Sequence, residues 1–259
     1  MNATKTPVHV AHDVQGPAGG GPLVLSNSLG TTWGMWDAQA GPLADRFRLV
    51  RYDLRGHGRS PVVAGPYDIA DLGADLLALL DRLDVARAHL CGVSLGGMVC
   101  LWVAAHAPER VDRVVVFCTS ANLGPPEAWL ERAATVRAHG TAAVADAVVA
   151  RWFTPDFRRL RPRSVDAMRA MLAATPAEGY AGCCEAIAGM DLRADLPAVR
   201  ARTLAVAAAD DPATPPAHAH AIAGAIPGCR VVVVDRAAHL LNVERPAVAT
   251  GLVLAHLGA

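Results

Sequence analysis

The chain has 259 residues, 53% of them hydrophobic, and its 24 basic and 24 acidic residues leave a formal net charge of zero at pH 7. Its length suits one α/β domain of about 250 residues that carries an insertion, and the lack of a clustered basic face argues against nucleic acid as a partner. No apolar run approaches the ~18 residues of a transmembrane helix, and the first residues lack a secretory signal, so we expect a cytoplasmic protein that does not bind membranes.

The cysteines and histidines do not form the pattern of a metal centre. None of the six cysteines makes a C-x-x-C pair, and free buried thiols are expected in a chain of this size without a signal. His218 and His220 lie two positions apart, which on a helix directs them to different faces. We therefore expect no bound metal.

Short apolar runs alternate with segments of helical periodicity, as between Asp68 and Leu83. The predicted elements, in chain order, are strands at 22–27 and 47–53, a helix at 68–83, a strand at 88–93, a helix at 95–107, strands at 113–118 and 202–208, a helix at 216–225, a strand at 230–235 and a helix at 246–257. This alternation predicts right-handed βαβ units, and hence an α/β fold with a mostly parallel central sheet flanked by helices.

Residues 121–198 interrupt the alternation with helical patterns and no convincing strand. We expect this segment to be a helical lid inserted into a core formed by residues 1–120 and 199–259. Ligands of open α/β sheets bind beyond the carboxyl ends of the strands, where such a lid would lie.

The stretch "LCGVSLGGM" (90–98) places Ser94 between the strand at 88–93 and the helix that starts near Leu95. A G-x-S-x-G sequence in this strand–turn–helix context indicates a nucleophile elbow. Glycines at 92 and 96 allow strand and helix to approach closely. The alternative is a glycine-rich turn in which the serine only caps the helix.

A serine nucleophile needs a base within hydrogen-bonding reach, and in this type of fold an acid and then a histidine follow the serine along the chain. His239 lies between the strand at 230–235 and the last helix. The acid should follow the strand at 202–208, where Asp210 and Asp211 are adjacent. Neighbouring side chains point in different directions, so only one of the two can reach His239.

Beyond these features, the chain resembles the α/β-hydrolase superfamily, and more closely the 3-oxoadipate enol-lactonases of the β-ketoadipate pathway. The resemblance extends from about residue 20 to about residue 250. The stretches that carry it are "GVSLGG" (92–97), "YDLRGHGRS" (52–60), "LSNSLGTTWGMWDAQ" (25–39), "ARWFTPDF" (150–157), "GYAGCCEAIAGMDLR" (179–193) and "AHLLNVERP" (238–246).

The resemblance implies a Ser94–Asp211–His239 triad, with Asp211 chosen because it lies four residues before a proline, as the family's acid does. It implies an oxyanion hole formed by the backbone N–H groups of Ser28 and Leu95. It also implies a cofactor-independent reaction in which an acyl-enzyme forms as the ring of 3-oxoadipate enol-lactone opens.

A substrate with a carboxylate needs a cationic partner, and a guanidinium can bind a carboxylate through two hydrogen bonds. Arg151 is the candidate for this partner. The alternative is that Arg151 lies at the surface, on an amphipathic helix of the lid. Trp152 and Trp33 are candidates for the walls of the pocket, and ordinary packing is the alternative for Trp33.

Two other functions compete with this interpretation. One is a general carboxylesterase, perhydrolase or C–C bond hydrolase that uses the same triad. The other is a non-catalytic receptor for a small ligand. The partner is in each case a small molecule, and the oligomeric state is left open.

Overall fold

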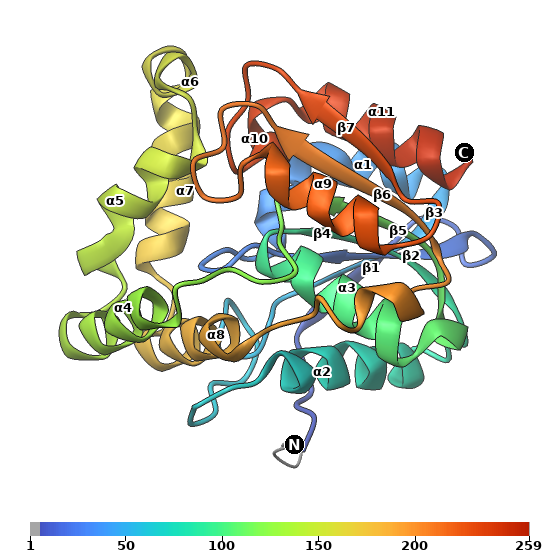
Figure 1. Cartoon of the computed structure of the whole chain (residues 1–259), viewed down its shortest axis with the longest axis horizontal. Helices are drawn as coiled ribbons and strands as arrows, with labels where there is room; N and C mark the ends of the chain where they lie inside the picture. The colour runs from blue at the N-terminus through green and yellow to red at the C-terminus, as the bar shows by residue number, and fades with distance from the viewer. Residues whose placement is uncertain (1–5, 259) are drawn as a thin grey trace.

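The computed structural model describes residues 6–258 of the chain. Its centre is a seven-stranded sheet with the strand order β1-β3-β2-β4-β5-β6-β7 (Figure 1). The strands are β1 (His12–Gln15), β2 (Gly21–Ser26), β3 (Phe47–Tyr52), β4 (Ala88–Val93), β5 (Val111–Phe117), β6 (Arg202–Ala208) and β7 (Arg230–Val234). Only β1 is antiparallel to its neighbour, β3, and the other adjacent strands are parallel.

Helices cover both faces of the sheet, so its central strands are buried on both sides and are apolar almost throughout. α1 (Asp37–Ala44) and α11 (Pro246–Leu257) pack against each other on one face, and α2 (Ile69–Arg82) and α3 (Leu95–His106) pack against each other on the other face. The remaining helices near the sheet are α9 (Pro216–Ala225) and the short α10 (Leu241–Glu244).

Five α-helices lie between β5 and β6, a part of the chain that is described throughout. They are α4 (Pro126–His139), α5 (Ala142–Trp152), α6 (Pro155–Leu160), α7 (Pro162–Ala173) and α8 (Ala177–Gly189). α4 packs along α8, and α5 packs against α7. The group stands beside the carboxyl ends of the strands (Figure 1). The division of the chain into a core and a lid domain stays a prediction.

Every strand and helix predicted outside 121–198 is present, with bounds that agree to within two residues. The prediction missed β1, α1 and the short α10. β1 has only four residues and is half-exposed at the edge of the sheet, so its hydrophobic pattern is weak. α1 contains Gly41 and Pro42, both poor helix formers.

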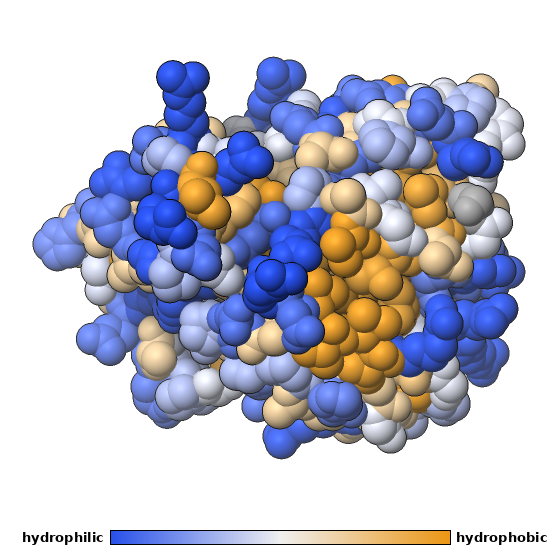
Figure 2. All heavy atoms as spheres, turned by 90° about the horizontal axis from the view of Figure 1, so that it is seen from above, coloured by the Kyte–Doolittle hydropathy of each residue, from blue (hydrophilic) through white to orange (hydrophobic). Residues whose placement is uncertain are grey.

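Strand β7 forms the other edge of the sheet and, with α11, carries exposed apolar side chains: Val233 is 41% exposed and Val248 is 36% exposed. A cluster of hydrophobic residues flanked by hydrophilic ones is visible when the molecule is seen from above (Figure 2). No helix within residues 6–258 is both long and apolar enough to cross a bilayer.

All six cysteines are free, five of them buried and Cys229 half-buried, in agreement with the prediction of free thiols.

Candidate active site

Ser94 occupies a strained turn between β4 and α3. Its backbone has φ 54° and ψ −118°, a conformation that costs a non-glycine residue on the order of 1–3 kcal/mol. The turn leaves no room for side chains on either flanking glycine. A Cβ at Gly92 would lie 2.3 Å from the carbonyl oxygen of Gly96, and a Cβ at Gly96 would lie 2.2 Å from that of Ser26. The structure thus contains the tight strand–turn–helix that the G-x-S-x-G sequence predicts.

The end of the neighbouring strand β5 holds this turn in place. The Ser94 N–H donates to the carbonyl oxygen of Phe117 at 2.9 Å. The hydroxyl of Thr119 donates to the carbonyl oxygen of Ser94 at 2.7 Å. Both bonds involve the backbone of Ser94, and neither engages its hydroxyl group.

His239 and Asp211 form a buried pair on the loops that follow β7 and β6. Nδ1 of His239 lies 2.8 Å from Oδ2 of Asp211. Asp211 also accepts the N–H groups of Ala213 and Thr214, at 2.8 and 3.1 Å, and the Thr214 hydroxyl at 2.7 Å. Burial acts to raise the pKa of Asp211, but the charge and hydrogen bond of His239, with the bonds from Thr214, lower it to about 2. The carboxylate is thus ionised and fixed in position.

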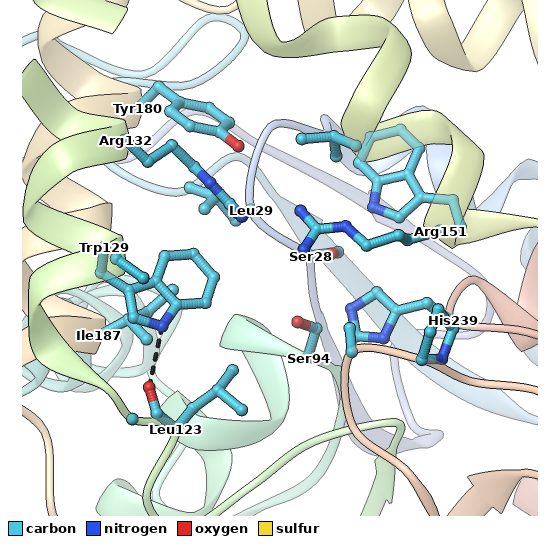
Figure 3. A pocket seen from close by; sticks show the side chains of 16 residues that line it. Ser28, Leu29, Ser94, Leu123, Trp129, Arg132, Arg151, Tyr180, Ile187 and His239 are labelled. Carbon is cyan, nitrogen blue, oxygen red and sulfur yellow. Dashed lines mark hydrogen bonds between the residues drawn. The ribbon is translucent and has the colours of Figure 1, made fainter. Parts of the chain in front are cut away.

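Ser94 and His239 face the same cavity of about 200 Å³ (Figure 3). Their side chains make no direct hydrogen bond with each other in this structure. In unliganded enzymes such bonds are often long and shorten only when substrate is bound. Asp210, by contrast, is exposed and lines a separate opening together with Arg236 and Glu244.

The backbone N–H groups beside the cavity differ in their partners. Ser28 lines the cavity, but its N–H points at the thioether sulfur of Met35, 3.3 Å away. Leu29 lines the cavity as well, and its N–H meets no acceptor among the described residues. The N–H of Leu95 also meets no acceptor among these residues, because the first N–H groups of a helix have no intrahelical partner. Near the elbow, the amides of Leu29 and Leu95 are therefore free to bind a ligand, whereas that of Ser28 contacts Met35.

His57 braces the loop that carries these amides. Its Nε2 accepts the N–H of Gly30 at 3.0 Å, and its Nδ1 lies 3.1 Å from the carbonyl oxygen of Arg55. Burial lowers the pKa of His57 to about 4, so the ring is neutral at neutral pH, with the proton on Nδ1 and the lone pair on Nε2.

Of the predicted pocket residues, Arg151 and Trp152 line the cavity and Trp33 does not. The Trp33 N–H donates to Asp53 at 2.8 Å, and the Arg59 guanidinium lies over its ring, 5.2 Å from the centroid. These contacts hold Trp33 in the turn outside the cavity, so the packing alternative describes it.

Six cavity residues from the inserted helices were not predicted, and the polar or aromatic ones among them are Trp129 and Arg132 on α4 and Tyr180 on α8. The signal available for the first two was their spacing of three residues, which places them on one helix face. The Arg132 guanidinium lies over the Trp129 ring, 4.5 Å from its centroid. The indole N–H of Trp129 donates to the carbonyl oxygen of Leu123 at 2.8 Å (Figure 3).

A hydroxyl at a strained elbow, an imidazole paired with an ionised carboxylate, and two amides without acceptors are the components of nucleophilic acyl transfer. Among residues 6–258 no group of three or more histidine, cysteine, aspartate or glutamate side chains is arranged to hold a metal ion.

Comparison with known proteins agrees with this chemistry. Residues 21–246 match the model of the alpha/beta hydrolase fold family. The 3-oxoadipate enol-lactonase 2 of Acinetobacter baylyi is 42% identical over 224 residues, which cover 86% of this chain and 84% of that protein. The enol-lactonase of Burkholderia xenovorans superimposes with a TM-score of 0.94 at 40% identity, covering 96% of both chains. A hydrolase from Pseudomonas aeruginosa superimposes with a TM-score of 0.93 at 46% identity, covering 96% of this chain and 94% of that one.

Proposed function

This chain belongs to the α/β-hydrolase family and is an ester-hydrolysing enzyme similar to the 3-oxoadipate enol-lactonases, and on that basis we propose that it opens the ring of 3-oxoadipate enol-lactone with Ser94 as nucleophile. The observation that carries the proposal is the His239–Asp211 pair, at 2.8 Å, facing the same small cavity as the Ser94 elbow. The substrate is the one named for the enol-lactonase of Acinetobacter baylyi.

In the first half of the reaction, His239 takes the hydroxyl proton of Ser94 as its oxygen attacks the ring carbonyl. Asp211 keeps the imidazole in the required tautomer and stabilises the imidazolium. The tetrahedral oxyanion is received by the N–H groups of Leu95 and Leu29, and loss of one such donor typically costs about 100- to 1000-fold in rate.

Collapse of the tetrahedral intermediate breaks the ring C–O bond and leaves an acyl-enzyme. The leaving group is an enolate, which accepts the proton from His239 and then becomes a ketone. In the second half, His239 removes a proton from water, the water oxygen attacks the acyl carbon, and Ser94 leaves as a free hydroxyl. The product carries a new carboxylate, and no cofactor takes part.

The carboxylate that the lactone already carries needs a cation inside the cavity. Arg151 fits this role, because its side chain reaches the cavity from α5. Trp152, on the same helix, supplies an apolar wall beside it.

The decisive experiment follows the ultraviolet absorbance of 3-oxoadipate enol-lactone mixed with purified protein, with the Ser94→Ala protein as control. Rapid loss of absorbance that depends on Ser94 is the expected result. Hydrolysis of simple aryl esters without any action on the enol-lactone would contradict the proposed substrate and favour a general carboxylesterase. Failure of a fluorophosphonate to label Ser94 would contradict the proposed nucleophile.

A further inference from the structure

Glu244, the last residue of α10, places a buried carboxylate between the insertion and the loop that carries His239. Its Oε1 accepts the hydroxyl of Thr154 and, at 3.3 Å, the N–H of the same residue. Its Oε2 accepts the N–H of Ala238 at 2.9 Å. A buried carboxylate is costly unless hydrogen bonds replace its water, so these three bonds fix its position.

The two residues that Glu244 connects belong to different parts of the molecule. Thr154 lies at the corner between α5 and α6, where its hydroxyl also accepts the N–H of Phe157 at 3.2 Å and so caps α6. Ala238 immediately precedes His239 in the loop after β7. The side chain of Glu244 therefore links the corner of the insertion to the segment that holds the proposed base.

A second hydrogen bond joins the same corner to the other side of His239. The N–H of Leu240 donates to the carbonyl oxygen of Trp152, the last residue of α5, at 3.0 Å. The backbone amides on both sides of His239 are thus bound at this corner, that of Leu240 directly and that of Ala238 through Glu244. Together they fix the backbone from which the imidazole extends.

We propose that Glu244 is a positioning residue for the reaction, which transmits the position of the α5–α6 corner to His239 and so holds the imidazole where it can take the proton of Ser94. The inference rests on the proposed function, in which His239 is the base. Glu244 lines a different opening from the one that Ser94 and His239 face, so it acts through the backbone of the loop. A displacement of about 1 Å at a reacting group can lower a rate by about 100-fold.

The donors around Glu244 distinguish a carboxylate from an amide at this position. Each of its oxygens accepts a backbone N–H group, whereas the amide of a glutamine has a single oxygen to accept with, and its nitrogen only donates. In Glu244→Gln one end of the link is therefore retained, and at the other end two N–H donors face each other. Glu244→Ala removes both ends.

The test measures how fast a fluorophosphonate modifies Ser94, because this reaction needs the activated serine but not the natural substrate. We expect Glu244→Ala to lower the second-order rate constant of modification, and kcat on the enol-lactone, by about 10- to 100-fold. Glu244→Gln should lower both by about 3- to 10-fold. KM should stay within about threefold in each variant, because the position of the base affects the chemical step.

Two results for the Glu244 variants would overturn the proposal. One is a Glu244→Ala protein that is folded by circular dichroism and is modified at the rate of the unsubstituted protein. The other is a rise in KM with unchanged kcat, which would assign Glu244 to substrate binding.

Thr154 tests the other end of the link and serves in place of Glu244→Ala if that variant does not fold. Thr154→Val removes the hydroxyl that binds Glu244 and should slow the modification of Ser94 by about 3- to 10-fold. Thr154→Ser keeps the hydroxyl and should retain most of the rate. An undiminished rate in Thr154→Val would overturn the proposal.

Thr141→Val provides the matched control. Thr141 lies in the same insertion, and its buried hydroxyl donates to the carbonyl oxygen of Thr175 at 2.8 Å. Loss of this bond should leave the modification of Ser94 unchanged. A loss of rate as large as in Thr154→Val would overturn the proposal, because any weakening of the insertion would then have the same effect.

The inference and the proposed function fail in different ways. Slower modification of Ser94 in Glu244→Ala, with no turnover of the enol-lactone by any of the proteins, would support the positioning role and contradict the proposed substrate. Turnover of the enol-lactone with equal kcat in Glu244→Ala and the unsubstituted protein would overturn the positioning role and leave the proposed function standing.

Discussion

Asp211 and His239 are joined by a 2.8 Å contact between Oδ2 and Nδ1, although Asp211 has an acidic neighbour, Asp210, that the sequence alone does not distinguish from it. The difference lies in the turn after β6. There Asp211 accepts two backbone N–H groups and the Thr214 hydroxyl, whereas Asp210 faces another opening of the protein.

This difference predicts the effects of two matched substitutions. Asp211→Asn should lower kcat by about 1000- to 10,000-fold, because an amide favours the wrong tautomer of the imidazole. Asp210→Asn should stay within about twofold of the unsubstituted enzyme. Steady-state kinetics on the enol-lactone measures both, and circular dichroism verifies that each variant is folded. A larger loss for Asp210→Asn would reverse the choice of acid.

The strained serine predicts a second outcome. Ser94→Ala should abolish almost all turnover, leaving only the small rate that binding and the free amides support. Because alanine also has a Cβ, the backbone strain at φ 54° is retained and the thermal unfolding midpoint should change little. Covalent labelling by a fluorophosphonate, followed by mass spectrometry, should find the modification on Ser94 and none in the variant.

The glycines of the elbow predict a contrast in stability. Gly96→Ala would place a Cβ 2.2 Å from the carbonyl oxygen of Ser26, and we expect it to lower the free energy of unfolding by about 2–3 kcal/mol. Gly251, inside α11, has no atom within 4 Å of the corresponding position. Gly251→Ala should therefore stabilise the protein by about 0.5–1 kcal/mol. Chemical denaturation of both variants measures the two effects, and equal values would contradict the steric argument.

His57 predicts how stability depends on pH. Its pKa is about 4 in the folded protein, because burial disfavours the charged ring, against 6.5 for an exposed histidine. The unfolded chain therefore binds this proton first as the pH falls. The stabilisation due to neutral His57 is complete above pH 6.5 and is lost as the pH falls to about 4, a change of about 3 kcal/mol.

His57→Gln keeps an acceptor for the Gly30 N–H but does not titrate. Its free energy of unfolding should fall less between pH 6.5 and pH 4 than that of the unsubstituted protein. The pKa values of His89 and His256 are also lowered by burial, but both residues are present in the two proteins, so the difference in slope reports His57. Parallel curves from urea denaturation would refute the assignment.

The elements of the sheet and the tight turn at Ser94 could be predicted because their signals are local. An apolar run followed by a glycine-flanked serine determines both the strand and the turn that ends it, and His239 follows a strand in the same way. The choice of Asp211 over Asp210 depends on the resemblance to a family, because the burial and the hydrogen bonds that distinguish the two side chains exist only in the folded turn.

The walls of the cavity could not be predicted in this way. Arg132 and Tyr180 face Ser94 because α4 and α8 pack along each other beside the carboxyl ends of the strands, a relationship between distant segments. Trp33 is a candidate for the pocket wall from the sequence, with ordinary packing as the alternative. The bond of its N–H to Asp53 and its stacking with Arg59 direct it elsewhere. For Trp33, nearness to the site in the sequence did not imply nearness in the folded protein.

The order of the strands supports the two proposed reacting residues unequally. Ser94 lies at the end of β4, which is held between β2 and β5, whereas His239 lies on the loop after β7, which pairs with β6 alone. Local unfolding of β7 would displace His239 and abolish activity while the turn that holds Ser94 is still intact. We therefore expect that, on heating, enzymatic activity is lost at a lower temperature than the helical circular dichroism signal.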